Sequence, residues 1–180
     1  MNRNSGAIFS DDAIRLPQDG WPSDCLLTAT AIRDADPDAA PPEIRTVSGD
    51  TVFVPSLQRA ELERFCATHE IRLTRRPNVW GYLLEPFLDT SFTAEQQAGT
   101  IERLARAGLA AAEVARIRGQ VGPLMLAYNS VHWDWHHLGL ADLLDAACGS
   151  VVPEHLRIGP TDRAAFHAWA MEIADRPNSV

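Results

Sequence analysis

The sequence contains no lysine: all 16 basic residues are arginine, and they stand against 24 acidic residues, for a formal net charge of −8. Such a chain lacks the broad basic surface that binding to nucleic acid or to an anionic membrane requires. No apolar run reaches the roughly 18 residues that span a bilayer. The first fifteen residues also contain no apolar stretch as long as that of a signal peptide. We therefore predict a cytoplasmic protein that binds neither nucleic acid nor membrane.

Cysteine is also scarce, with three residues at positions 25, 66 and 148. Their number is odd, and no two lie close enough in sequence to form a zinc knuckle or a redox pair. Cys66 and Cys148 fall in apolar helical patterns, where a free cysteine is usually a small buried hydrophobe. This usage is typical of a reducing compartment.

The first part of the chain differs from the rest in composition. Residues 11–50 hold nine acidic residues, three arginines and five of the twelve prolines. Because proline fixes φ and disfavours helix at the residue before it, we predict an acidic, partly irregular arm over residues 1–42. β-Branched residues on both sides of Ser48 and Gly49 predict a small hairpin near residues 43–55.

Apolar residues recur at helical spacing in the remainder of the chain. Thr93 and Gln96 have the spacing of a capping box, and an apolar stripe runs from Val114 to Leu138 at intervals of three and four residues. The hydrophobic content of 46% is enough for a core of its own. We therefore predict a mainly α fold, with a single helical domain of about five to six helices over residues 43–180.

The segment from residue 128 to residue 138 is the most informative for function, because it holds three of the six histidines and two tryptophans. On a continuous helix His132 and His136 share one face, and two imidazoles at this spacing can chelate a divalent transition metal. Asp134 and His137 form a second pair, and Glu85 and Asp89 are further carboxylates at helical spacing. The candidate metal ligands are His132, His136, Asp134, His137, Glu85 and Asp89.

The alternative is that the tryptophans of this segment anchor the core and the histidines lie half-exposed, hydrogen-bonded to the backbone or to Asp134. We prefer it because a metal site needs three or four ligands, and Trp133 stands where a zinc-protease helix carries its glutamate. No cofactor is therefore predicted, although a divalent transition metal stays open. The same histidines also define a surface that would titrate near neutral pH.

Arg72, Arg75 and Arg76 form a second cluster, in a chain that is otherwise acidic. Arginine suits bidentate recognition of carboxylate or phosphate, so the cluster indicates either an anion site or a contact with the acidic arm. We prefer the arm contact, because residues 34–38 supply the counter-charge. No glycine-rich phosphate loop and no nucleophile motif accompanies the cluster.

Residues 93–121 have the outline of a DNA-binding helix-turn-helix, but they hold four arginines against three glutamates. A helix that enters the major groove of DNA needs a clearly basic surface, so we expect an ordinary helix pair. No complete catalytic constellation is present, and no catalytic residue is assigned. We predict a protein-binding or regulatory module, with a protein partner or a homo-oligomer as the state in which it acts. The alternative is a metal-dependent enzyme with a helical histidine and carboxylate site.

Overall fold

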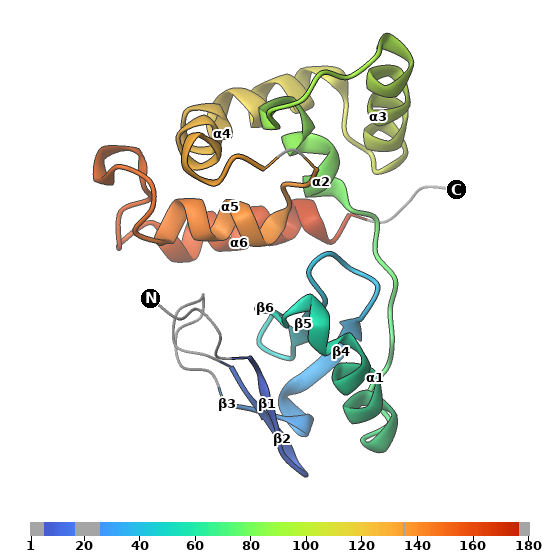
Figure 1. Ribbon diagram of the computed structural model, residues 1–180. Coiled ribbons are helices and arrows are strands. Elements are labelled where there is room, and N and C mark those ends of the chain that lie inside the picture. Colours follow the sequence, from blue (N-terminus) through green and yellow to red (C-terminus); the bar gives the residue numbers. More distant parts are fainter. Residues whose placement is uncertain (1–5, 17–25, 135, 177–180) are drawn as a thin grey trace. The chain divides into compact units, whose positions relative to one another are not determined.

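The structure is a computed structural model, and it describes residues 6–16, 26–134 and 136–176. The chain divides into two units, residues 1–76 and residues 77–180 (Figure 1). We call them the N-terminal unit and the helical unit and describe each by itself.

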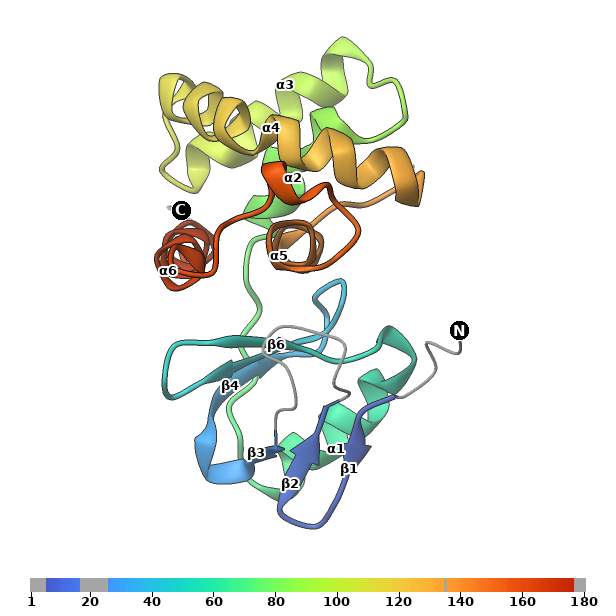
Figure 2. The ribbon, with the colours of Figure 1, turned by 90° about the vertical axis from the view of Figure 1, so that its left-hand side faces the viewer.

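Within its described residues, the N-terminal unit contains two antiparallel sheets and one α-helix (Figure 2). The first sheet has the strand order β1-β2-β3, and the second has the order β4-β5-β6. The strands are β1 (Ile8–Phe9), β2 (Ala13–Arg15), β3 (Leu26–Thr28), β4 (Ile32–Asp36), β5 (Glu43–Thr46) and β6 (Thr51–Phe53). A short 3-10 turn, η2 (Ser56–Gln58), leads into helix α1 (Arg59–Thr68).

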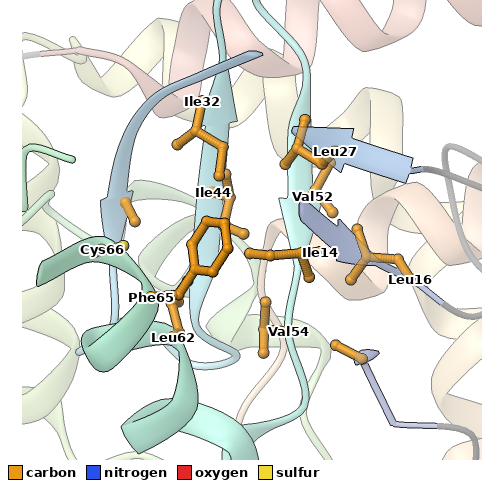
Figure 3. Close-up of a cluster of buried hydrophobic side chains, with 12 residues drawn as sticks. Ile14, Leu16, Leu27, Ile32, Ile44, Val52, Val54, Leu62, Phe65 and Cys66 are labelled. Atoms are coloured by element: carbon orange, nitrogen blue, oxygen red, sulfur yellow. The ribbon is translucent and has the colours of Figure 1, made fainter. Parts of the chain in front are cut away.

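The core of the N-terminal unit lies between the strands and α1 (Figure 3). Ile14 pairs with Leu27 and Ile44 pairs with Val52 across neighbouring strands, and all four side chains are buried. Helix α1 presents one apolar face to them, made of Leu62, Phe65 and Cys66. Each such side chain contributes about 1.5–3 kcal/mol when it leaves water. Burial also raises the pKa of the Cys66 thiol to about 11, as expected for a cysteine that acts as a core residue.

The prediction of a mainly α fold with one helical domain and an irregular arm is wrong. Helices, including 3-10 turns, make up 52% of the described residues, and two three-stranded antiparallel sheets make up 13%, so the fold is mixed. The predicted arm contains β2 and β4, while residues 1–5 and 17–25 of it lie outside the described residues. Strands of two to five residues are too short to show a periodic pattern. The hairpin expected near residues 43–55 is present as β5 and β6, with Gly49 at φ +93° in its turn.

The helical unit is built around a short buried helix, α2 (Val79–Leu84), which packs against α3, α4 and α6. Trp80 of α2 is buried and donates its indole N–H to the carbonyl oxygen of Ala170 at 2.9 Å. Its ring also meets the edge of Trp169 at 5.6 Å between centroids. The other elements are the 3-10 turns η3 (Glu85–Phe87) and η4 (Glu154–Leu156) and the helices α3 (Ala94–Arg106), α4 (Ala111–His132), α5 (Leu140–Cys148) and α6 (Arg163–Ala174).

The start of α3 follows local chemistry that the sequence shows. The predicted capping box is present, because Thr93 Oγ1 accepts the backbone N–H of Gln96 and the Gln96 side chain accepts that of Thr93. Helix α4 continues through Pro123, and α5 and α6 lie side by side (Figures 1 and 2). No helix among the described residues is both long and apolar enough to cross a membrane.

Candidate functional site

The end of α4 sets the geometry of the candidate site. The helix ends at His132, and the next residue, Trp133, has left-handed backbone angles of φ +53° and ψ +43°. Its N–H still donates to the carbonyl oxygen of Asn129 at 2.9 Å, which closes the last turn. The expectation of a continuous helix to Leu138 is therefore wrong, and His132 and His136 do not share a helix face. A left-handed residue ends a helix, and apolar spacing carries no signal of such an end.

A buried amide, Asn129, ties the turn after α4 to a second segment of the chain. Its Nδ2 donates to the carbonyl oxygens of Phe87 and Asp134, at 3.0 and 3.2 Å. Its Oδ1 accepts the backbone N–H of Asp134 at 2.8 Å. The backbone N–H of Asp89 also donates to the carbonyl oxygen of Asp134, at 3.3 Å. These bonds hold η3 and residues 88–89 against the end of α4.

Asp134 organises the backbone around it. One carboxylate oxygen, Oδ1, accepts the backbone N–H groups of His136 and His137, at 3.0 and 3.1 Å. This is a local side-chain turn of the kind that Asp forms readily. Two peptide N–H groups therefore already bind one oxygen of Asp134, which the metal hypothesis names as a candidate ligand.

The predicted metal ligands are dispersed. Glu85 begins η3, where the positive charge of Arg118 is its neighbour, and the imidazole of His132 stacks on the ring of Tyr128 at 4.2 Å between centroids. The backbone N–H of Asp89, not its carboxylate, meets the carbonyl oxygen of Asp134. Across residues 6–16, 26–134 and 136–176, no three His, Cys, Asp or Glu side chains converge as a metal would require.

A groove of about 340 Å³ opens between η3 and the end of α4. Apolar side chains dominate its walls, and one carboxylate, Asp89, lies among them. We call it the Trp133 groove, and its lining residues are Pro86, Phe87, Leu88, Asp89, Leu126, Asn129, Ser130 and Trp133. The η3 wall is packed closely on the helix, because a Cβ at Gly122 would lie 3.4 Å from the Phe87 ring.

Tyr128, next to the groove residue Asn129, faces α5 rather than the groove. Its hydroxyl group lies 3.2 Å from Asp145 Oδ2 and 3.4 Å from Asp142 Oδ1. Burial raises the pKa of Tyr128, and the two carboxylates raise it further, so the phenol stays protonated and donates. Burial likewise raises the pKa of Asp142, although its Oδ2 accepts the N–H of Gly139 at the start of α5. This cluster fastens α4 to α5 and is structural.

The arginine cluster of the N-terminal unit splits into Arg76, whose side chain is largely covered, and two exposed residues. Arg76 forms ion pairs with Asp34 and with Glu43, and its backbone N–H donates to Asp36 Oδ2 at 2.8 Å. Arg72 and Arg75 lie at the surface, and the Arg72 Nε donates to Thr74 Oγ1. The structure thus pairs the Arg76 guanidinium with the acidic segment 34–38, whereas Arg72 meets this segment through its backbone, its carbonyl oxygen accepting the N–H of Ala35 at 3.0 Å.

The groove residues Trp133 and Asn129 were missed by sequence reasoning. A polar Asn inside an otherwise apolar stretch, five residues before an Asp, is the signal that could have indicated the turn. Comparison with protein-family models, with curated proteins and with solved structures finds no match to this chain. The geometry of the site therefore carries the functional argument.

Proposed function

We propose that this chain is a protein-binding module whose Trp133 groove receives a short segment of a basic partner protein. The observation that carries the proposal is the exposure of large apolar side chains around one hollow: Trp133 is 65% exposed and Leu126 is 58% exposed. Apolar residues that gather in this way mark interaction sites, whereas scattered ones need no explanation. Tryptophan in particular is enriched among the residues that dominate binding energy.

The backbone conformation of Trp133 supports a role of this residue in binding rather than in the packing of its own unit. The residue that ends a helix in the left-handed conformation is usually glycine, because a side chain there costs about 1–2 kcal/mol. Trp133 bears this cost while most of its indole faces solvent, so burial within its own unit offsets little of it. Strained residues of this kind cluster at functional sites.

Charge selects the partner. Residues 77–180 contain twelve acidic residues and seven arginines. Asp89 is the one charged side chain among the described residues that line the groove, and it has no ion-pair partner within the described part of the chain. A basic segment complements this surface, and such complementarity speeds encounter and excludes acidic partners.

The proposal places the protein in the cytoplasm and uses no cofactor. Free cysteines at positions 66 and 148 are consistent with a reducing compartment. The metal-dependent alternative stays a prediction that elemental analysis of untagged protein decides.

The test is selection of peptides from a random library displayed on phage, with the full chain as bait. Three baits are compared: the wild type, a groove variant carrying Leu126→Ser and Trp133→Asn, and a control carrying Ile101→Ser. Asn tolerates the left-handed conformation, so the groove variant keeps the end of α4 while it loses the indole. Ile101 is an exposed apolar residue on α3, outside the groove, with 54% exposure.

We expect wild type and control to enrich peptides that combine an apolar side chain with a basic one, and the groove variant to lose them. Enrichment of the same peptides on the groove variant, or no enrichment on any bait, would overturn the proposal. Sedimentation velocity tests the other occupant, a second copy of the chain. A dimer that the groove variant dissociates would assign the groove to self-association and reject a basic partner.

A further inference from the structure

We infer that the Trp133 groove selects an arginine of the partner, with the guanidinium on the Trp133 indole and paired with the Asp89 carboxylate. This inference rests on the proposed function and names its specificity. It goes further because an apolar groove alone would accept any aliphatic or aromatic side chain.

Two features favour a cation at the Trp133 indole: the face of the ring and the C-terminal end of α4. Tryptophan attracts cations to its ring face more strongly than the other aromatic residues do. Trp133 also directly follows the 22-residue helix α4, whose last carbonyl groups carry partial negative charge. A positive group over this indole therefore interacts with both the ring and the end of the helix.

Asp89 is the carboxylate that remains for a ligand. Its side chain is exposed, lines the groove and has no ion-pair partner among the described residues. The hydrogen bond from its N–H to the carbonyl oxygen of Asp134 ties the Asp89 backbone to the turn after α4. The Asp134 carboxylate already accepts two backbone N–H groups, and Glu85 lies by the charge of Arg118.

The shape of the pair favours arginine over lysine. A guanidinium is planar, stacks on an aromatic face and presents two parallel N–H groups to a carboxylate. An ammonium is a compact, strongly hydrated charge and cannot use a ring face and a carboxylate edge in the same way. The described residues that line the groove include no arginine, so a partner arginine meets no guanidinium charge among them.

The test uses defined, fluorescein-labelled peptides in which one central residue is flanked by leucines. The central residue is arginine, lysine, citrulline or leucine, and affinity for the full chain is measured by fluorescence polarisation. Citrulline keeps the planar shape of arginine without its charge. We expect arginine to bind about tenfold tighter than citrulline, with lysine between them, and added salt to reduce the difference.

Three variants separate the contributions. Asp89→Asn and Trp133→Asn should each reduce the preference for arginine over citrulline severalfold, whereas Glu102→Gln, an exposed acid on α3 outside the groove, should leave it unchanged. Equal affinity for arginine and citrulline, with binding still dependent on Trp133, would overturn the inference and leave the proposed function standing. Absence of binding by the arginine peptide also overturns the inference. The proposed function itself is then judged by the library selection.

Discussion

Asn129 and Asp134 exchange two hydrogen bonds across the end of α4. The backbone N–H of Asp134 donates to Asn129 Oδ1 at 2.8 Å, and Asn129 Nδ2 donates to the carbonyl oxygen of Asp134 at 3.2 Å. The same Nδ2 reaches the carbonyl oxygen of Phe87 at 3.0 Å. One buried side chain thus joins both walls of the groove, and its geometry depends on a single amide.

Replacing Asn129 with Ala should destabilise the helical unit and open the groove. Three hydrogen bonds are lost at a buried position, and at about 1 kcal/mol each, partly restored by water, the expected loss is about 2 kcal/mol. Urea unfolding measures the loss, and hydrogen exchange at residues 87–89 and 134 locates it. Ser130→Ala, at the next and exposed position, is the control and should change stability by less than about 0.5 kcal/mol. An unchanged urea midpoint for Asn129→Ala would show that these bonds do not hold the walls.

Trp133→Gly should make the protein more stable and less able to bind. Glycine adopts the left-handed conformation without steric cost, so we expect a gain of about 1 kcal/mol and a higher Tm. Glu70 follows α1 with φ +54° and is also exposed, which makes Glu70→Gly the matched control. Both variants should gain similar stability, but only Trp133→Gly should lose peptide binding. A stability loss at Trp133→Gly would mean that the indole packs within its own unit.

In the helical unit, the sequence predicts those features that depend on residues close together in the chain. The reciprocal bonds of Thr93 and Gln96 lie within four residues, and the apolar stripe from Val114 to Tyr128 is buried as its spacing predicts. The stripe stays in phase beyond Tyr128, yet Val131 is exposed because the helix ends one residue after it. The end is set by a left-handed residue and by bonds to η3, which lies about 40 residues earlier in the chain. No local pattern encodes that contact.

The sequence predicts an irregular arm where strands are found, because acidic residues of β4 are buried in contact with an arginine. Asp34 and Asp36 are 6% and 3% exposed, although their density in sequence is typical of a solvated arm. The Arg76 guanidinium pairs with Asp34 and the Arg76 backbone N–H donates to Asp36, both about 40 residues away, so the sequence shows the acids and the arginine but not their contacts. Burying a carboxylate in a strand is costly unless hydrogen bonds and a positive charge from elsewhere in the chain compensate it.

Gln58 should prove more important for stability than its position in a short turn suggests. Its Oε1 accepts the backbone N–H of Ala7 at 2.6 Å, and its Nε2 donates to the carbonyl oxygen of Ala7 at 2.7 Å. The side chain thereby pairs with the backbone beside β1 as a neighbouring strand would. Gln58→Ala should cost about 1–2 kcal/mol and expose an unpaired strand edge, which favours aggregation.

The measurements for Gln58→Ala are chemical unfolding and light scattering during prolonged incubation. Gln120→Ala, at an exposed position on α4, is the control, since it removes the same side chain without touching a strand. If both variants unfold at the same denaturant concentration, the bonds to Ala7 contribute nothing net.

Acid should weaken the N-terminal unit through Asp34. Burial acts to raise the pKa of Asp34, but hydrogen bonds from Arg76 and Arg33, together with their charges, outweigh it and hold the pKa below its ordinary value. Because the folded pKa is depressed, the stabilisation is fully present above the unfolded value of about 4 and is lost as pH falls through the folded pKa. Unfolding free energy, followed by hydrogen exchange in β4 and β5, should therefore drop below about pH 4.

Asp34 pairs with two arginines of different exposure, so replacing each in turn shows how much the stabilisation by an ion pair depends on its burial. The Arg76 side chain is 12% exposed and that of Arg33 is 45% exposed, and both pair with Asp34. Arg76→Gln leaves a buried carboxylate short of a partner and should cost about 3 kcal/mol, whereas Arg33→Gln should cost less than about 1 kcal/mol. In Arg76→Gln the pKa of Asp34 also rises toward or above its ordinary value, so the loss of stability below pH 4 should shrink. Equal costs for the two variants, or an unchanged acid slope in Arg76→Gln, would show that Arg76 does not set the pKa of Asp34.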